Sequence, residues 1–415
     1  MQDEFIDATH PSSKCVDFES HIIATYYVES ELPLSNLAES MALSQTTGSW
    51  TPLKHETVEM RKKYCGKIVD ISNSHVKIAF PIDNLDPTRG GIPLLLTTTG
   101  GNLFDYTLFD NVKLLDLQLP KRYTSSFRGP KHGLEGVRRL LKVDHRPLLG
   151  TIVKPNLGLK SADVAEICYE AAYSGIDFIK DDDKNVNPKY CPIEDRVPKV
   201  MEKIDKANEE KGGKTLYAVN ITSGLDNILE MADLAISCGA NCLMVNVLSA
   251  GLSSLQALSE DPSINVPLHG HLDMIGLFAR NPKNGIGVAV ISRLARLAGA
   301  DHLHVGSIGG RLFTEKEDVK RSADILRCGW NNIRPTLPVC AGGLHPGIFD
   351  LNYSLVGNDA LYICGGGIHG HPEGISAGVK AMIQAIETCS QHIPFEQALQ
   401  NFKEFRIAIE KWGKK

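Results

Sequence analysis

The stretch GIDFIKDDDKNVN, residues 175–187, decides the fold of this chain. Its apolar residues Ile176, Phe178 and Ile179 resemble a short buried strand. That strand runs directly into Lys180 and then into three aspartates, residues 181–183. An amine beside three carboxylates at the end of a buried strand is typical of an enzyme that builds its active site at strand ends.

The same pattern of apolar strand, polar loop and amphipathic helix recurs along the chain. We predict eight strands, at residues 147–155, 176–181, 215–222, 242–248, 266–272, 301–307, 337–343 and 360–367. They are short and apolar on both faces, as parallel strands covered by helices are. The fold class is therefore predicted to be α/β, with a C-terminal (β/α)8 TIM barrel catalytic domain.

The N-terminal part lacks this repeat. Residues 20–30 and 67–82 resemble strands and residues 34–45 resemble a helix. We predict an N-terminal α+β domain over residues 1–125 and the barrel over residues 126–415, with a linker near residues 120–133.

Composition excludes several classes of protein. Of the 415 residues, 42% are hydrophobic and 22% are charged, and the formal net charge is −5. This balance is that of a soluble globular protein without the basic patch that nucleic acid or an anionic membrane surface would require. The N-terminus resembles no signal peptide, and the ten cysteines form no CxxC pair. We expect reduced thiols and a cytoplasmic location.

Polar residues end nearly every predicted barrel strand, on the rim where barrel enzymes carry their chemistry. The Lys180–Asp183 cluster suits Mg²⁺, and a neutral lysine that reacts with CO2 becomes a carbamate, which is one more oxygen ligand. We expect the crowded carboxylates to raise the pKa of Lys180. The alternative is a solvated acidic loop with a surface ion pair.

Other rim residues offer acid–base and anion-binding chemistry. Lys154 could act as a general acid or base, or simply extend from a strand end into solvent. LHGHL and HLHVG each place two histidines on one strand face, where one of each pair could instead be packed in the interior. Glycine-rich loops follow the last two strands, at 341–347 and 364–374, and favour phosphate over simple tight turns.

In order and spacing, these motifs resemble the large subunit of ribulose bisphosphate carboxylase/oxygenase (RuBisCO). The motifs are GTIVKPNLGL, GIDFIKDDDKNVN, HGHL, GADHLHVGSIGGRL, CAGGLHPG and CGGGIHGHP, together with TTGSWTPL and GGNLFDY upstream. The resemblance covers most of the chain. It implies a homodimer whose active sites combine the N-terminal domain of one chain with the barrel of the other.

The resemblance also implies a role for each matching residue. Lys180 would be the carbamylated lysine, with Asp182 and Asp183 as the other Mg²⁺ ligands, although the family usually has glutamate at position 183. Lys154 would be the general acid/base. His271 and His304 would be active-site histidines, and Asn102 would contact metal and substrate. Residues around one phosphate would be Trp50, Gly342, Gly343, Gly365 and Gly366.

Several departures from the family pattern bear on the substrate. They are Ser44 for a glutamate, Asn156 for a lysine, Leu272 for an arginine, Ile275 for a histidine, Ala341 for a serine and Arg311 for the mobile-loop lysine. Leu272 and Ile275 remove donors from the second phosphate site, at a cost of about 2–5 kcal/mol for a phosphate bound there. The sequence is therefore identified as a RuBisCO-like protein rather than a carboxylase.

Three functions fit this set of residues. The favoured one is Mg²⁺-dependent formation of an enediolate from a monophosphorylated 3-oxo sugar acid, such as 3-oxo-isoapionate 4-phosphate, by decarboxylation or by transcarboxylation and hydrolysis. The alternatives are an enolase or ketose isomerase of a methylthio-sugar phosphate in methionine salvage, and a catalytically silent barrel with a regulatory role. RuBisCO-like enolases tend to carry a lysine where this chain has Asn102, which disfavours the enolase.

Overall fold

The computed structural model describes residues 16–49, 51, 53–312 and 314–415. The chain folds into two compact units. The first comprises residues 1–127, 275–294 and 331–333, and the second comprises residues 128–274, 295–330 and 334–415. The predicted boundary at residue 125 stays a prediction, but residues 275–294 lie within the predicted barrel segment and pack with the first unit.

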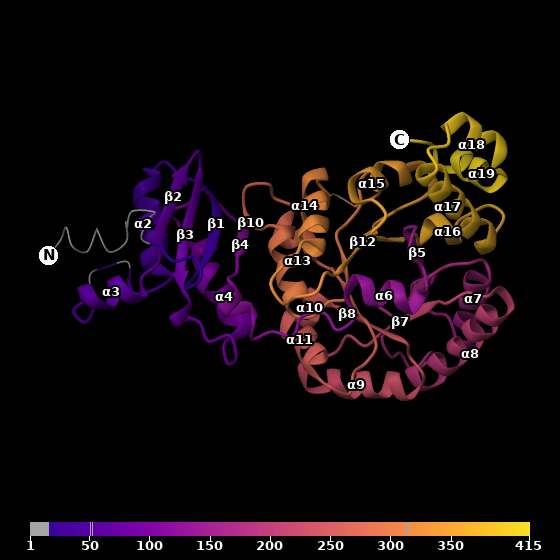
Figure 1. Ribbon diagram of the computed structural model, residues 1–415, viewed down its shortest axis with the longest axis horizontal. Coiled ribbons are helices and arrows are strands. Elements are labelled where there is room, and N and C mark those ends of the chain that lie inside the picture. The colour runs from indigo at the N-terminus through magenta and orange to yellow at the C-terminus, as the bar shows by residue number, and fades with distance from the viewer. Residues whose placement is uncertain (1–15, 50, 52, 313) are drawn as a thin grey trace. The chain divides into compact units, whose positions relative to one another are not determined.

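The first unit is built on a mixed sheet with the strand order β10-β4-β1-β3-β2 (Figure 1). Its strands are β1 (His21–Glu29), β2 (Lys67–Ser72), β3 (His75–Pro81), β4 (Asn111–Gln118) and β10 (Gly285–Ile286). Its α-helices include α2 (Leu34–Ser44), α3 (Val58–Tyr64), α4 (Gly91–Thr99), α5 (Lys121–Thr124) and α12 (Ile275–Ala279). The predicted helix and the first predicted strand are present, whereas the segment predicted at residues 67–82 forms two antiparallel strands, β2 and β3, joined by a turn. Helix α5 lies inside the predicted linker.

The second unit is a closed barrel of parallel strands. Around the barrel the order is β5-β6-β7-β8-β9-β11-β12-β13. The strands are β5 (Leu148–Ile152), β6 (Phe178–Lys180), β7 (Leu216–Asn220), β8 (Cys242–Asn246), β9 (Leu268–His271), β11 (His302–His304), β12 (Leu337–Ala341) and β13 (Leu361–Ile363). Each lies within a predicted strand, so the predicted fold class is confirmed.

Helices surround the barrel strands in Figure 1. They include α7 (Ser161–Tyr173), α8 (Ile193–Lys211), α9 (Leu225–Ser237), α11 (Leu252–Glu260), α14 (Lys316–Arg327), α15 (Phe349–Val356) and α17 (Ile375–Ser390). Further helices lie at strand ends and at the C-terminus: α6 (Gly133–Leu141), α10 (Val247–Ala250), α16 (Gly366–His369), α18 (Phe395–Asn401) and α19 (Lys403–Trp412). Helix α13 (Val288–Leu297) begins in the first unit and ends in the second.

The barrel interior is apolar at its centre. Phe178, Ala218, Met244 and Val339 belong to one buried cluster contributed by different strands. Because residues two apart on a strand point to the same side, Phe178 places Lys180 on the inner face, one layer nearer the C-terminal rim. No helix in the described part of the chain combines the length and apolar character needed to cross a membrane.

Candidate active site

The predicted site residues of the barrel lie at the C-terminal strand ends. Lys180, His271 and His304 are the last residues of β6, β9 and β11. Lys154 follows β5, and the two glycine pairs follow β12 and β13. The closed barrel therefore gathers onto one rim residues that are more than 200 positions apart in the chain.

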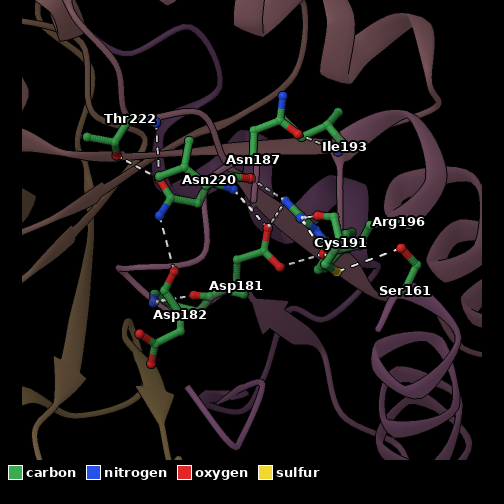
Figure 2. Close-up of polar contacts among 12 residues, drawn as sticks. Ser161, Asp181, Asp182, Asn187, Cys191, Ile193, Arg196, Asn220 and Thr222 are labelled. Carbon is green, nitrogen blue, oxygen red and sulfur yellow. Dashed lines mark hydrogen bonds and ion pairs between the residues drawn. The ribbon is translucent and has the colours of Figure 1, made fainter. Parts of the chain in front are cut away.

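Asp181 and Asp182 face different surroundings. Figure 2 shows the Asp181 carboxylate directed at Arg196 and Asn220, whereas the Asp182 carboxylate points away from them. Asp181 accepts hydrogen bonds from Tyr217 Oη at 2.6 Å, the Asn220 backbone N–H at 3.0 Å and Arg196 Nη2 at 3.1 Å. Asp181 is fully buried and its carboxylate is committed to these partners, so it anchors the strand end and is not available to a metal.

Asp182 and Asp183 instead hold lysine ammonium groups. Lys154 Nζ lies 2.5 Å from Asp182 Oδ2. Lys184 Nζ lies 2.9 Å from Asp183 Oδ2 and 3.9 Å from Asp182 Oδ1. Burial is the largest single effect on Asp183 and favours its neutral form, but the hydrogen bond and charge of Lys184 and the contact with Asp182 together outweigh it and hold the pKa of this carboxyl below its usual value. Two adjacent carboxylates that each attract a cation form a hard-oxygen pair of the kind that Mg²⁺ uses.

Two asparagines hold the backbone of this carboxylate pair. Asn220 Nδ2 donates to the carbonyls of Asp182 at 3.1 Å and Asp183 at 3.0 Å, and Asn246 Nδ2 donates to the Asp183 carbonyl at 2.9 Å. The Asn220 amide is itself oriented by Thr222, whose hydroxyl donates to Oδ1 at 2.6 Å. Because the amides bind carbonyls, the side-chain oxygens of Asp182 and Asp183 stay directed at cations.

Lys180 is fully buried, and its ammonium donates to the Asp181 carbonyl at 2.7 Å. Burial lowers the pKa of Lys180 to about 8, although the charges of Asp183 and Asp182 act in the opposite direction. The carboxylates do act to raise this pKa, as expected, but the net shift is downward because desolvation of the ammonium is the larger effect. The lowered pKa favours the neutral amine, which is the form that can react with CO2.

The histidines line the barrel next to this lysine. The rings of His271 and His304 lie 4.5 Å apart between centroids. Burial lowers the pKa of both well below its ordinary value, with the positive charge of Lys180 adding to the effect. Both rings are therefore neutral and can each donate and accept one hydrogen bond. Deeper in the barrel, His269 and His302 are fully buried against Phe178, which is the interior packing expected as the alternative for one member of each pair.

The glycine loops lie close to two of the cationic residues. A Cβ added to Gly343, whose φ is +94°, would stand 2.9 Å from the backbone nitrogen of Arg311, so only glycine allows this approach. A Cβ on Gly365 would lie 3.3 Å from Lys154 Cε, whereas one on Gly366 would meet open space. The loop after β13 is thus adjacent to Lys154 and leaves room for a ligand.

Two predicted site residues fall outside this group of barrel residues. Asn102 caps a short 3₁₀ helix (Leu103–Asp105) in the first unit. Trp50 lies outside the described residues. Both roles stay predictions.

Sequence reasoning counted Asn220 and Asn246 among the polar strand ends at the rim but did not predict that they support the carboxylate pair. It missed the cation Lys184 and the structural role of Asp181. Strand alternation offered a signal for the last, because Lys180 and Asp182 fall on one side of the strand and Asp181 on the other. No local pattern shows which groups the two asparagines bind, since their partners lie 37 and 63 residues away in the chain.

Comparison with known proteins agrees with the motifs. The model of the ribulose bisphosphate carboxylase large chain, catalytic domain, matches residues 133–412, and that of the N-terminal domain matches residues 12–123. A ribulose bisphosphate carboxylase-like protein of Archaeoglobus fulgidus is 39% identical over 395 residues, which covers 91% of this chain and 89% of the relative.

Solved structures show the same similarity. The octameric ribulose-1,5-bisphosphate carboxylase/oxygenase of Pyrococcus horikoshii has a TM-score of 0.90 at 30% identity, covering 99% of this chain and 97% of that one. A rubisco-like protein (MtnW) of Alicyclobacillus acidocaldarius has a TM-score of 0.84 at 33% identity, covering 95% of this chain and 100% of that one. The predicted resemblance is confirmed: the chain belongs to the RuBisCO large-chain family, among its RuBisCO-like members.

Proposed function

We propose that this protein is a Mg²⁺-dependent enzyme that forms an enediolate from a monophosphorylated 3-oxo sugar acid, such as 3-oxo-isoapionate 4-phosphate, with loss or transfer of its carboxyl group. The observation that carries the proposal is the carboxylate pair of Asp182 and Asp183 beside a buried lysine whose pKa is lowered to about 8. Asp182, Asp183 and the carbamate of Lys180 would hold the metal.

The donor set fits such an ion. Both carboxylates already face ammonium groups, and the charges of both act on Lys180, whose pKa burial nevertheless lowers. A Mg²⁺ ion held there would polarise the substrate ketone and its neighbouring oxygen. The shorter aspartate at position 183 still supplies a carboxylate oxygen.

The chain's own residues would carry the remaining steps. When the substrate carboxyl group leaves as CO2, the electron pair of the broken C–C bond stays on the adjacent carbon, and Lys154 would deliver a proton there. The ammonium of Lys154 is 2.5 Å from Asp182, which keeps its proton-bearing end at the carboxylate pair. His271 and His304, both neutral, would hydrogen-bond to substrate hydroxyl groups.

Substrate selection would depend on the two ends of the site. Gly342, Gly343, Gly365 and Gly366 would bind one phosphate through backbone N–H groups, with Arg311 beside Gly343. At the other end Leu272 is buried and offers no donor where the family has arginine. A second phosphate would lack a charged partner, so a substrate with one phosphate is favoured over ribulose bisphosphate.

The test is a product analysis. The enzyme is incubated with Mg²⁺, bicarbonate and 3-oxo-isoapionate 4-phosphate labelled with ¹³C at the carboxyl carbon. We expect labelled CO2, or two smaller acids if the carboxyl group is transferred and the chain hydrolysed. An isomer with the label retained would favour the enolase alternative. The controls are Lys180→Ala, which should be inactive, and Asp195→Asn, an exposed change on α8 that should be fully active.

The catalytically silent alternative makes a separate prediction. If Lys180 forms a carbamate that helps to bind Mg²⁺, then Mg²⁺ and CO2 together should raise the melting temperature, and neither should do so alone. Lys180→Ala should abolish the effect. An equal response in the variant would support the regulatory role.

We also propose a homodimer with shared sites, which the similarity to an oligomeric enzyme supports. Asn102 of one chain would then act with Lys180 of the other. Mixing Asn102→Ala chains with Lys180→Ala chains should restore about a quarter of wild-type activity, because random pairing gives half heterodimers with one intact site each. No recovery on mixing would place each site within a single chain.

A further inference from the structure

A group of three histidines lies inside the barrel mouth. His269, His271 and His304 each offer one ring nitrogen, and these three atoms lie within 4.8 Å of one another. His269 and His304 are buried, and His271 is partly exposed toward the rim. A fourth interior histidine, His302, does not belong to the group.

The strands place these rings firmly. His269 and His271 are two residues apart on β9, and His302 and His304 are two apart on the neighbouring strand β11. His302 pairs with His269 in the parallel register, so His304 lies one layer higher, level with His271. Rings fixed by two hydrogen-bonded strands need little ordering to bind a ligand together.

The hydrogen bonding of the group is incomplete. The Nε2 atoms of His269 and His304 are 3.0 Å apart, so one ring donates to the other. The Nδ1 atoms of His269 and His271 are buried and have no hydrogen-bond partner among the described residues, and the same holds for both ring nitrogens of His302 outside the group. His269 faces His304 through Nε2, so its unpartnered Nδ1 is not the nitrogen directed at His304. Buried polar nitrogens without partners are uncommon in folded proteins, and a bound ligand is one explanation for them.

The spacing fits a tetrahedral transition-metal ion. Two histidine nitrogens bound to Zn²⁺ at 2.0–2.1 Å stand about 3.3 Å apart, close to the 3.0 Å between His269 and His304 and within the 4.8 Å limit of the group. We propose that His269, His271 and His304 form a second divalent-cation site, selective for imidazole-preferring ions such as Zn²⁺, with its fourth position open to the barrel mouth. Such a site differs in chemistry from the oxygen-rich pair Asp182 and Asp183, which suits Mg²⁺.

Occupancy would affect the reaction, a consequence that rests on the proposed function. The ion would bind nitrogen lone pairs of His271 and His304 and place positive charge beside Lys180. Zinc is therefore expected to inhibit an enzyme that Mg²⁺ and CO2 activate. The binding itself does not depend on that function and can be tested without any substrate.

The binding test uses Zn²⁺ alone, with a chromogenic chelator as competitor. Wild type and Lys180→Ala should bind Zn²⁺ equally, because the histidine site does not use the Lys180 carbamate. His269→Gln should weaken binding about 100-fold or more, since it removes one of three ligands. His302→Gln is the matched control: it removes an equally buried imidazole of the same interior that lies outside the group, and it should bind as wild type does.

Anomalous diffraction at the zinc edge from soaked wild-type crystals locates the ion even if a variant fails to fold. A peak between the three rings supports the proposal. A peak at Asp182 and Asp183, a peak at a cysteine such as the exposed Cys328, or no peak would overturn it. Loss of binding in Lys180→Ala with retention in His269→Gln would overturn it as well, and would leave the proposed Mg²⁺ site unaffected.

Discussion

Removing the Asp181 charge is expected to destabilise the barrel while leaving the carboxylate pair in place. Asp181 and Arg196 are both fully buried, and their ion pair measures 3.1 Å. In Asp181→Asn, the amide oxygen still accepts from Tyr217 or from the Asn220 backbone, but the Arg196 cation loses its counter-charge. Breaking a buried pair from one side costs about 3–5 kcal/mol.

The other hydrogen bonds of Arg196 indicate where in the range of about 3–5 kcal/mol the loss of stability should fall. Its guanidinium also donates to the carbonyls of Cys191 at 2.5 Å and Val186 at 2.8 Å, and these bonds remain in the variant. We therefore expect the lower end, about 3 kcal/mol. At about 2 °C per kcal/mol, the calorimetric transition of the barrel should fall by about 6 °C.

Two controls make the result decisive. Asp195→Asn removes an exposed ion pair with Lys199 from the start of α8 and should cost no more than about 0.5 kcal/mol. The double variant Asp181→Asn/Arg196→Met removes both buried charges and should be more stable than the sum of the two single losses predicts. Strictly additive losses, or an Asp181→Asn transition within about 1 °C of wild type, would refute the reasoning.

Three further predictions concern the cations of the site. Because burial lowers the pKa of Lys180 to about 8, the neutral amine increases as the pH rises. CO2 uptake, measured by mass spectrometry of the trapped carbamate, should rise with pH most steeply around 8, and a flat profile would contradict this. Lys154→Met should lower turnover about 10²–10⁴-fold, because it removes the general acid/base. Calorimetry should show undiminished Mg²⁺ binding in this variant, because the Lys154 ammonium 2.5 Å from Asp182 competes with the metal. Weaker Mg²⁺ binding would count against that competition. Lys184→Ala should strengthen Mg²⁺ binding about 2–5-fold by freeing the exposed side of Asp183, and an unchanged affinity would show that this ion pair does not oppose the metal.

The sequence predicted the barrel because each of its strands carries the signal locally. An apolar run flanked by a polar loop and an amphipathic helix is readable without knowledge of distant contacts. The rim position of Lys180, His271 and His304 followed from the same periodicity, since strand ends in a closed parallel barrel share one edge. The strands came out shorter than predicted because apolar residues continue beyond the hydrogen-bonded ladder, as in the ALYICGGG stretch, where β13 ends at Ile363.

Other features of the fold depended on contacts far apart in the chain. Strand β4 was not predicted, although half of its residues are apolar. Strand β10 is two residues long and pairs with β4 across more than 150 positions. No window of sequence reveals that residues 275–294 pack with the first unit. Such pairings are decided by tertiary packing, which outweighs local preference in short elements.

The sequence alone determined which chemical groups meet at the rim, because periodicity fixes the side of the strand on which each residue falls. Only the tertiary structure decided the protonation and the ion-pair partners of these groups. Burial rather than neighbouring carboxylates sets the pKa of Lys180, and Arg196 on α8 commits Asp181 to a structural role while Asp182 stays available. The physical reason is that desolvation and ion pairing depend on what surrounds a group in three dimensions, whereas alternation along a strand depends only on its neighbours in the chain.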